Sequence, residues 1–200
     1  MNAHSKAGLR RAALEGRAGV PDEIRRAFAI RAARDGLALA RHHGSRSAAA
    51  YFPVRGEADP LPLLAELAAA GIETSLPRLA GRGKPLRFHL WRPGDALVDT
   101  PLGLREPSAG SPLLEPDLLI VPLAAFDRTG HRIGYGAGYY DATLAALTAK
   151  KQLAIGLAFA AQEVASIPAE PHDQPLAFVI TERETIDCRT SRKHASSLHW

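Results

Sequence analysis

The segment Asp117-Leu-Leu-Ile-Val-Pro122 is a short run of branched apolar residues between an acid and a proline. Such a run is typical of a strand that is buried on both faces of a parallel sheet. Similar apolar segments recur on both sides of it and alternate with stretches of helical character. The expected strands are 48–53, 72–77, 86–91, 117–122, 153–159 and 176–181, and the expected helices between them are 61–70 and 139–150. This alternation predicts a layered α/β/α domain with a mainly parallel sheet.

Outside this α/β core, assigned to residues 46–187 of a single domain, the chain has a helical start and a polar end. Ser5 can cap a first helix that ends near Gly16. Pro21, followed by two acids, opens a second helix that ends at Gly44. Residues 5–45 are therefore expected to be helical. Residues 188–200 are polar and without periodicity, which predicts a flexible tail.

The composition of the 200 residues, 46% hydrophobic and 23% charged, is that of a globular protein and excludes wholesale disorder. A single cysteine, Cys188, excludes an intrachain disulfide and any C-x-x-C site. The sequence contains no apolar run of transmembrane length and no signal-peptide core at its start, so we expect a cytoplasmic protein.

Positive charge is concentrated at the N-terminus: residues 1–50 carry ten Lys or Arg and four Asp or Glu. Such a segment can face nucleic acid, an anionic membrane or a polyanionic small molecule such as a nucleotide. It is also what the solvated face of an ordinary helix looks like. Charge alone leaves these interpretations open.

A glycine-rich segment, Phe126-Asp-Arg-Thr-Gly-His-Arg-Ile-Gly-Tyr-Gly-Ala-Gly-Tyr-Tyr-Asp141, follows the strongest expected strand and runs into an expected helix. Its glycines alternate, so backbone N–H groups can approach an anion closely. The N-terminus of the helix and Arg132 add positive charge. The segment fits neither G-x-G-x-x-G nor G-x-x-x-x-G-K-[ST]. From composition alone it is either an anion-binding loop or a tight surface turn.

The string Arg132-Ile-Gly-Tyr-Gly-Ala-Gly-Tyr-Tyr-Asp141, preceded by Pro122 and Phe126-Asp127, resembles the signature of the 5-formyltetrahydrofolate cyclo-ligase (5,10-methenyltetrahydrofolate synthetase) family. Further segments resemble that family in order over residues 5–187: Lys6-x-x-x-Arg10, Tyr51-Phe-Pro-Val-Arg-Gly-Glu57, Pro77-Arg78, Leu86-Arg-Phe88, Gly103-Leu-Arg-Glu-Pro107 and Pro168 to Asp173. The sequence departs from the family at Ala137, which is often Gly or Lys, and in the tail. The resemblance implies a fold similar to that of sugar-phosphate isomerases and CoA transferases.

The resemblance also implies an activity and a set of site residues. The activity is the ATP- and Mg²⁺-dependent cyclisation of 5-formyltetrahydrofolate to 5,10-methenyltetrahydrofolate, with release of ADP and phosphate. Arg132 and Tyr139 are the expected catalytic residues, and Asp141 and Asp173 the expected magnesium ligands. The expected ATP-binding residues are Lys6, Ala7, Gly8, Leu9, Arg10, Arg132, Ile133, Gly134, Tyr135, Gly136, Ala137, Gly138, Tyr139 and Tyr140. The expected folate-binding residues are Phe52, Glu57, Tyr135, Gly136, Ala137, Gly138 and Tyr139.

Structural interpretations and other functions stay open beside this one. Phe52 is as readily a core residue, and His131, His172, Trp91 and Trp200 are expected to be structural or on the surface. An ATP-independent isomerase or CoA transferase would keep the fold and the anion loop. An RNA-binding module would use the basic N-terminus, although the sequence carries no aromatic-rich RNA-binding motif. The expected partners are the two small-molecule substrates, with no nucleic acid, no membrane and a monomeric protein.

Overall fold

The computed structural model describes residues 5–81, 83–100, 103–147, 152–168, 170 and 173–197, with side chains up to residue 192. The expected end of the 139–150 helix, and His172 and Trp200, lie outside the described residues. Among these residues, no helix combines the length and the apolar character that crossing a bilayer requires.

A seven-stranded sheet forms the centre of the molecule. Its strand order is β11-β10-β9-β6-β1-β2-β3. The strands are β1 (Ser47–Ala49), β2 (Glu73–Arg78), β3 (Arg87–Leu90), β6 (Leu118–Val121), β9 (Leu153–Leu157), β10 (Phe178–Ile180) and β11 (Thr185–Asp187). The strands from β10 to β2 run parallel, whereas β3 and β11 pair antiparallel at the two edges. The mainly parallel sheet predicted from the sequence is confirmed.

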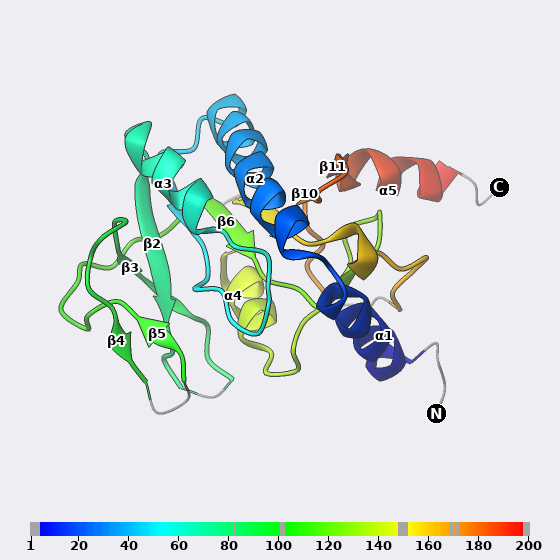
Figure 1. Cartoon of the computed structure of the whole chain (residues 1–200), viewed down its shortest axis with the longest axis horizontal. Coiled ribbons are helices and arrows are strands. Elements are labelled where there is room, and N and C mark those ends of the chain that lie inside the picture. Colours follow the sequence, from blue (N-terminus) through cyan, green and yellow to red (C-terminus); the bar gives the residue numbers. More distant parts are fainter. Residues whose placement is uncertain are drawn as a thin grey trace.

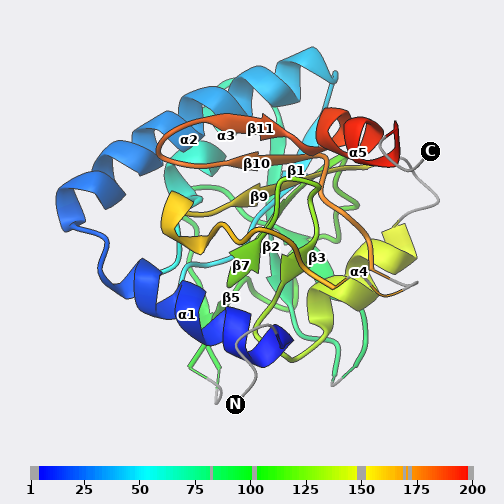
Figure 2. The ribbon, with the colours of Figure 1, turned by 90° about the vertical axis from the view of Figure 1, so that its right-hand side faces the viewer.

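Helices cover both faces of this sheet, because successive residues of a strand point to opposite sides. Ile120 and Ile155 lie in one buried cluster with side chains of α2 (Asp22–His42) and α3 (Leu61–Ala69). Their neighbours Val121 and Ala154 lie in a second cluster with Leu144 of α4 (Tyr139–Leu147). Figure 2 shows α2 and α4 on opposite sides of the strands. Helices α2, α3 and α4 are all expected from the sequence.

The first helix, α1 (Lys6–Ala18), belongs to neither layer. The Ser5 hydroxyl caps it as expected, accepting a hydrogen bond from the Gly8 N–H at 3.1 Å. The helix ends at Ala18, two residues beyond the expected end near Gly16. Gly16 instead lies where α1 crosses the 3₁₀ turn η2 (Ala160–Gln162), and a Cβ at this glycine would lie 2.9 Å from the Ala161 carbonyl oxygen. Figure 1 shows α1 below α2 and apart from β2 and β3.

Two small antiparallel pairs complete the strands. β4 (Val98–Asp99) pairs with β5 (Arg105–Glu106), and β7 (Ala125–Phe126) pairs with β8 (Arg132–Ile133). The second pair lies directly before the glycine-rich loop. It therefore fixes the position from which that loop starts.

The C-terminal segment differs from the expectation of a tail without regular structure. Residues Cys188–Ser197 form helix α5. Cys188 at its start is fully buried, and the Arg192 guanidinium donates to the carbonyl oxygens of Thr129 at 2.6 Å and Leu176 at 3.0 Å. These tertiary contacts order a segment whose own sequence has no apolar periodicity.

Candidate active site

The candidate site lies at the carboxyl-terminal ends of the parallel strands β1, β6 and β9. The segments that follow these strands meet there, and this edge is the usual place for ligands in open α/β sheets. Helix α1 contacts all three segments. Arg17 Nη2 donates to the Arg55 carbonyl oxygen at 2.8 Å, Arg10 Nε to that of Gly134 at 2.8 Å, and Lys6 Nζ to Glu170 Oε1 at 2.8 Å.

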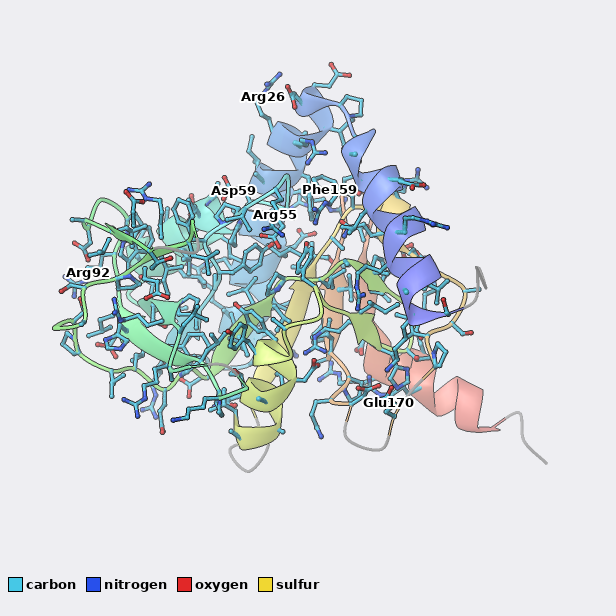
Figure 3. The ribbon with its side chains drawn as sticks, turned by 90° about the horizontal axis from the view of Figure 1, so that it is seen from below. Arg26, Arg55, Asp59, Arg92, Phe159 and Glu170 are labelled. Atoms are coloured by element: carbon cyan, nitrogen blue, oxygen red, sulfur yellow. The ribbon has the colours of Figure 1, made fainter. Side chains whose placement is uncertain are left out.

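Arg55 and Glu170, which are labelled in Figure 3, lie toward opposite ends of α1. The helix is held to the rest of the molecule by apolar packing as well, because Ala13 is buried against Ala125, Ile133 and Ile167. Three basic residues of α1, Lys6, Arg10 and Arg17, are therefore turned toward the strand ends.

The glycine-rich loop runs from Gly134 to Gly138, between β8 and α4. Gly136 has φ +93° and Gly138 has φ +71°, values that a side chain would strain. Gly134 differs, because its φ lies outside the left-handed region. A Cβ built on Gly134 meets no described heavy atom within 4 Å. Neither its backbone conformation nor its packing requires glycine at position 134.

Arg132 and Asp141 bracket this loop. Arg132 Nη1 and Nη2 both donate to Asp141 Oδ1, each at 2.8 Å. The Arg132 side chain is 4% exposed, whereas that of Asp141 is 43% exposed. Burial lowers the pKa of Arg132, and the carboxylates of Asp141 and Asp173 counteract this effect. Within the described part of the chain, the buried Nε of Arg132 has no hydrogen-bond partner.

Lys6 lies in a second charged cluster with Glu170 and Asp173. Its ammonium is 2.8 Å from Glu170 Oε1 and 3.5 Å from Asp173 Oδ2. The hydrogen bond to Glu170 is the main cause that raises the pKa of Lys6. Asp173 also accepts the Glu170 N–H at 2.8 Å. The Lys6 cluster and the Arg132–Asp141 pair are electrostatically connected, because the charges of both Asp141 and Asp173 raise the pKa of Arg132.

The structure brings only part of the expected N-terminal nucleotide segment to the strand ends. Lys6 and Arg10 contact the loops, as stated above. Ala7 is exposed, and the Gly8 N–H is used by the Ser5 cap. Leu9 packs against the apolar cluster beneath α1.

Glu57 follows β1 and lies beside the glycine-rich loop. Its Oε2 accepts the Val54 N–H at 2.9 Å. Burial raises the pKa of Glu57. The hydrogen bond from the Val54 N–H and the charges of Arg17 and Arg55 counteract this rise. Glu57 is thus a partly buried carboxylate next to positive charge.

The expected aromatic residues have different surroundings. Phe52 packs against the core, and the Arg105 guanidinium lies 5.2 Å from its ring centroid. Tyr139 packs against the cluster on the α4 face, and Tyr140 contacts the clusters on both faces. The Tyr140 hydroxyl is buried and has no hydrogen-bond partner among the described residues. Burial raises its pKa.

Sequence reasoning missed two residues of the site, Arg17 and Glu170. A signal for Arg17 existed, because it lies seven residues after Arg10 and therefore on the same face of α1. No local pattern marks Glu170, whose partner Lys6 is 164 residues away. His131, expected on the surface, lies in the β7–β8 turn with its Nδ1 2.9 Å from the Thr129 hydroxyl.

The described ranges hold no group of three or more His, Cys, Asp or Glu side chains that could bind a metal ion. The two expected metal ligands, Asp141 and Asp173, each pair with a basic side chain. A complete protein cage for a metal is therefore absent from this part of the chain.

Comparison with known proteins agrees with this geometry. Residues 2–182 match the 5-formyltetrahydrofolate cyclo-ligase family. The chain is 37% identical over 196 residues to the 5-formyltetrahydrofolate cyclo-ligase of Mycolicibacterium smegmatis, covering 93% of this chain and 98% of that protein. It is also 37% identical over 145 residues to the Escherichia coli K12 protein of the same description, covering 68% of this chain and 78% of that protein.

Solved structures show the same relationship. The NMR structure of Aquifex aeolicus 5,10-methenyltetrahydrofolate synthetase matches with a TM-score of 0.77 and 28% identity, covering 92% of this chain and 93% of that one. A 5,10-methenyltetrahydrofolate synthetase from Mycoplasma pneumoniae matches with a TM-score of 0.69 and 22% identity, over 88% of this chain and 97% of that chain, which supports the fold alone. The chain belongs to the 5-formyltetrahydrofolate cyclo-ligase family.

Proposed function

We propose that this protein is a 5-formyltetrahydrofolate cyclo-ligase that consumes ATP and forms 5,10-methenyltetrahydrofolate, ADP and phosphate. The observation that carries the proposal is the arrangement at the strand ends. A side-chain-poor loop with basic residues of α1 and β8 lies next to a partly buried carboxylate, Glu57. A loop for phosphates and a carboxylate for a pterin are what joining these two substrates requires.

The nucleotide lies, in this proposal, along the Gly134–Gly138 loop. Gly134 has no packing reason to lack a side chain, so close approach of phosphate oxygens supplies one. The N-terminus of α4 and the buried guanidinium of Arg132 add positive charge beneath the loop. Arg10 fixes the loop by donating to the Gly134 carbonyl oxygen. Lys6, at the N-terminal end of α1, faces the phosphates from beside Glu170.

Mg²⁺ fits this site as a companion of ATP and not as a resident ion. Asp141 and Asp173 are hard oxygen donors near Arg132, but two carboxylates do not fill an octahedron. Asp141 and Asp173 would hold the ion together with nucleotide phosphates and water. The ion supplies neutralisation of the charge that develops on the transferred phosphoryl group.

The folate lies beside Glu57, with Phe52 and Tyr139 as flanking aromatics. An ionised Glu57 accepts hydrogen bonds from N–H groups of the pterin. The formyl oxygen then attacks the γ-phosphorus and displaces ADP. N10 attacks the activated formyl carbon and loses its proton, and phosphate leaves from that carbon as the methenyl bridge forms. Arg132 is placed to stabilise the phosphoryl oxygens as their charge grows, because it is preorganised by Asp141.

The basic N-terminus supports a small-molecule site better than RNA binding. Lys6, Arg10, Arg17 and Arg25 all donate hydrogen bonds within the protein, so they do not form an open basic surface. We further propose a monomeric, cytoplasmic enzyme that binds neither nucleic acid nor membrane. An ATP-independent isomerase or transferase would leave the Arg132–Asp141 pair without a role in catalysis.

The test is a turnover assay with 5-formyltetrahydrofolate and MgATP. We expect methenyl product, followed by its near-ultraviolet absorbance, with one phosphate released for each product formed. Product formation without ATP would contradict the proposal, as would ATP consumption without ring closure.

A further inference from the structure

Arg17 is a buried charged side chain that contacts both halves of the proposed site. It is 6% exposed. Its Nη1 donates to the Tyr135 hydroxyl in the glycine-rich loop, and its Nη2 donates to the Arg55 carbonyl oxygen at 2.8 Å in the loop after β1. Its own carbonyl oxygen accepts a hydrogen bond from Arg25. The guanidinium is thus fixed on both sides.

This arrangement determines how the Tyr135 hydroxyl is used. A guanidinium has no acceptor, so the hydroxyl oxygen must accept from Arg17 and its proton must point elsewhere. The Tyr135 hydroxyl donates to the Leu123 carbonyl oxygen at 3.3 Å, in the segment that follows β6. It is thus held between helix α1 and the end of a central strand.

We propose that Arg17 is a positioning residue for the folate: it joins the glycine-rich loop, through the Tyr135 hydroxyl, to the loop that carries Glu57, through the Arg55 carbonyl oxygen. This inference rests on the proposed function, since it assumes that Glu57 binds the folate. Arg17 itself contacts neither reacting group. It acts through Tyr135 and through its charge.

The charge of Arg17 acts on Glu57 together with several neighbours. Arg55 lies on the same loop as Glu57, Tyr135 on the glycine-rich loop, and Tyr51 and Tyr140 also sense the charge of Glu57. Burial pushes the pKa of Glu57 up, and Arg17 holds it down. Without Arg17 that pKa rises further, and the fraction of ionised Glu57 falls at mildly acidic pH.

The experiment compares Arg17→Met with wild type and with Arg26→Met, which removes an exposed arginine of α2. We expect Arg17→Met to raise the KM for 5-formyltetrahydrofolate tenfold or more and to raise the KM for ATP much less. The acid limb of kcat/KM for folate should move to higher pH. Arg26→Met should match wild type in all three measurements.

A double-mutant cycle with Tyr135→Phe tests the route. If Arg17 acts through Tyr135, Arg17→Met should raise the folate KM much less in the Tyr135→Phe background than in wild type. Arg17→Lys keeps the positive charge but lacks the two parallel N–H donors of a guanidinium. The acid limb of kcat/KM for folate should therefore stay near its wild-type position, whereas the KM for folate should be restored only in part. If Arg17→Met does not fold, the KM values for folate and ATP can still be compared in Arg17→Lys and Tyr135→Phe.

A purely structural role predicts something else: a lower unfolding temperature and less active protein, with both KM values unchanged. That result would overturn the inference, provided that the wild-type protein turns over. Additive effects in the double-mutant cycle would also overturn it, as would a KM for ATP that rises as much as the KM for folate. An inactive wild type would overturn the proposed function as well, so the two failures are distinguishable.

Discussion

Replacing Gly134 by alanine separates the stability of the loop from its proposed use. Gly134 is outside the left-handed region of φ, and a Cβ there meets no described atom within 4 Å. A Gly→Ala change at such a position stabilises a protein by about 0.4–1 kcal/mol through the unfolded chain. For a domain of this size, that raises Tm by about 1–4 °C.

The same methyl group should nevertheless weaken nucleotide binding. If phosphate oxygens approach the backbone at Gly134, the methyl group displaces them and at least one charge-assisted hydrogen bond is lost. The loss is worth about 1.5–3 kcal/mol, or roughly ten- to a hundredfold in affinity. We therefore expect Gly134→Ala to unfold at an equal or higher temperature than wild type while its KM for ATP rises at least tenfold.

The assay pairs thermal unfolding without ligand with steady-state kinetics in both substrates. Gly110→Ala is the matched control, because the nearest contact of a Cβ at Gly110 is 3.8 Å and the neighbouring Ser111 lies against the edge strand β3. Gly110→Ala should have a Tm similar to that of Gly134→Ala, and its KM for ATP should equal that of wild type. An unchanged ATP KM in Gly134→Ala would refute the proposal that phosphates lie along this position.

Three further substitutions test individual roles. Asp141→Asn should raise the KM for ATP most at limiting Mg²⁺, and excess Mg²⁺ should restore part of the activity; a defect insensitive to Mg²⁺ would contradict a role in binding MgATP. Lys6→Ala should raise the KM for ATP about ten- to a hundredfold with little change for folate, and equal changes for both substrates would argue against phosphate binding. Glu57→Gln should raise the KM for folate by a similar factor and spare ATP. Because burial raises the pKa of Glu57 above 4.5, ionising it destabilises the folded state. Glu57→Gln should therefore raise Tm at neutral pH, and this gain should vanish well below pH 4.5.

The sheet was predictable where a strand is buried on both faces. The run 118–121 contains four fully buried apolar residues, and its pattern follows directly from burial. The expected strand at 48–53 ends instead at Ala49. Tyr51 is buried like a strand residue, but its hydroxyl donates to the Ala58 carbonyl oxygen at 2.6 Å in the loop that carries Glu57. Apolar character marks burial and does not distinguish a strand from a buried loop.

Strand β11 and helix α5 were not predicted from the sequence. Strand β11 has three residues and pairs with β10 across a turn in which the Thr181 N–H donates to the Glu184 carbonyl oxygen at 2.9 Å. Helix α5 is ordered by contacts of Cys188 and Arg192 with other segments.

For the site, the glycine-rich loop was visible because all of its parts are adjacent in sequence. The Arg132–Asp141 contact spans nine residues and lies within that motif, although an ion pair was not expected there. The pairing of Lys6 with Glu170, and the bridge from Arg17 to Arg55, arise only when the chain folds. The roles of the individual site residues stay predictions.

The position of α1 has a consequence for how the enzyme is made. This helix leaves the ribosome before the segments that it contacts, which are those of Arg55, Gly134 and Glu170, the last of them 164 residues from Lys6. The helix cannot complete its contacts until the chain through Glu170 has emerged. A chain that ends before residue 170 lacks the contact that fixes Lys6. We expect ribosome-bound chains of that length to be unable to bind ATP, so catalytic competence requires synthesis to pass this residue.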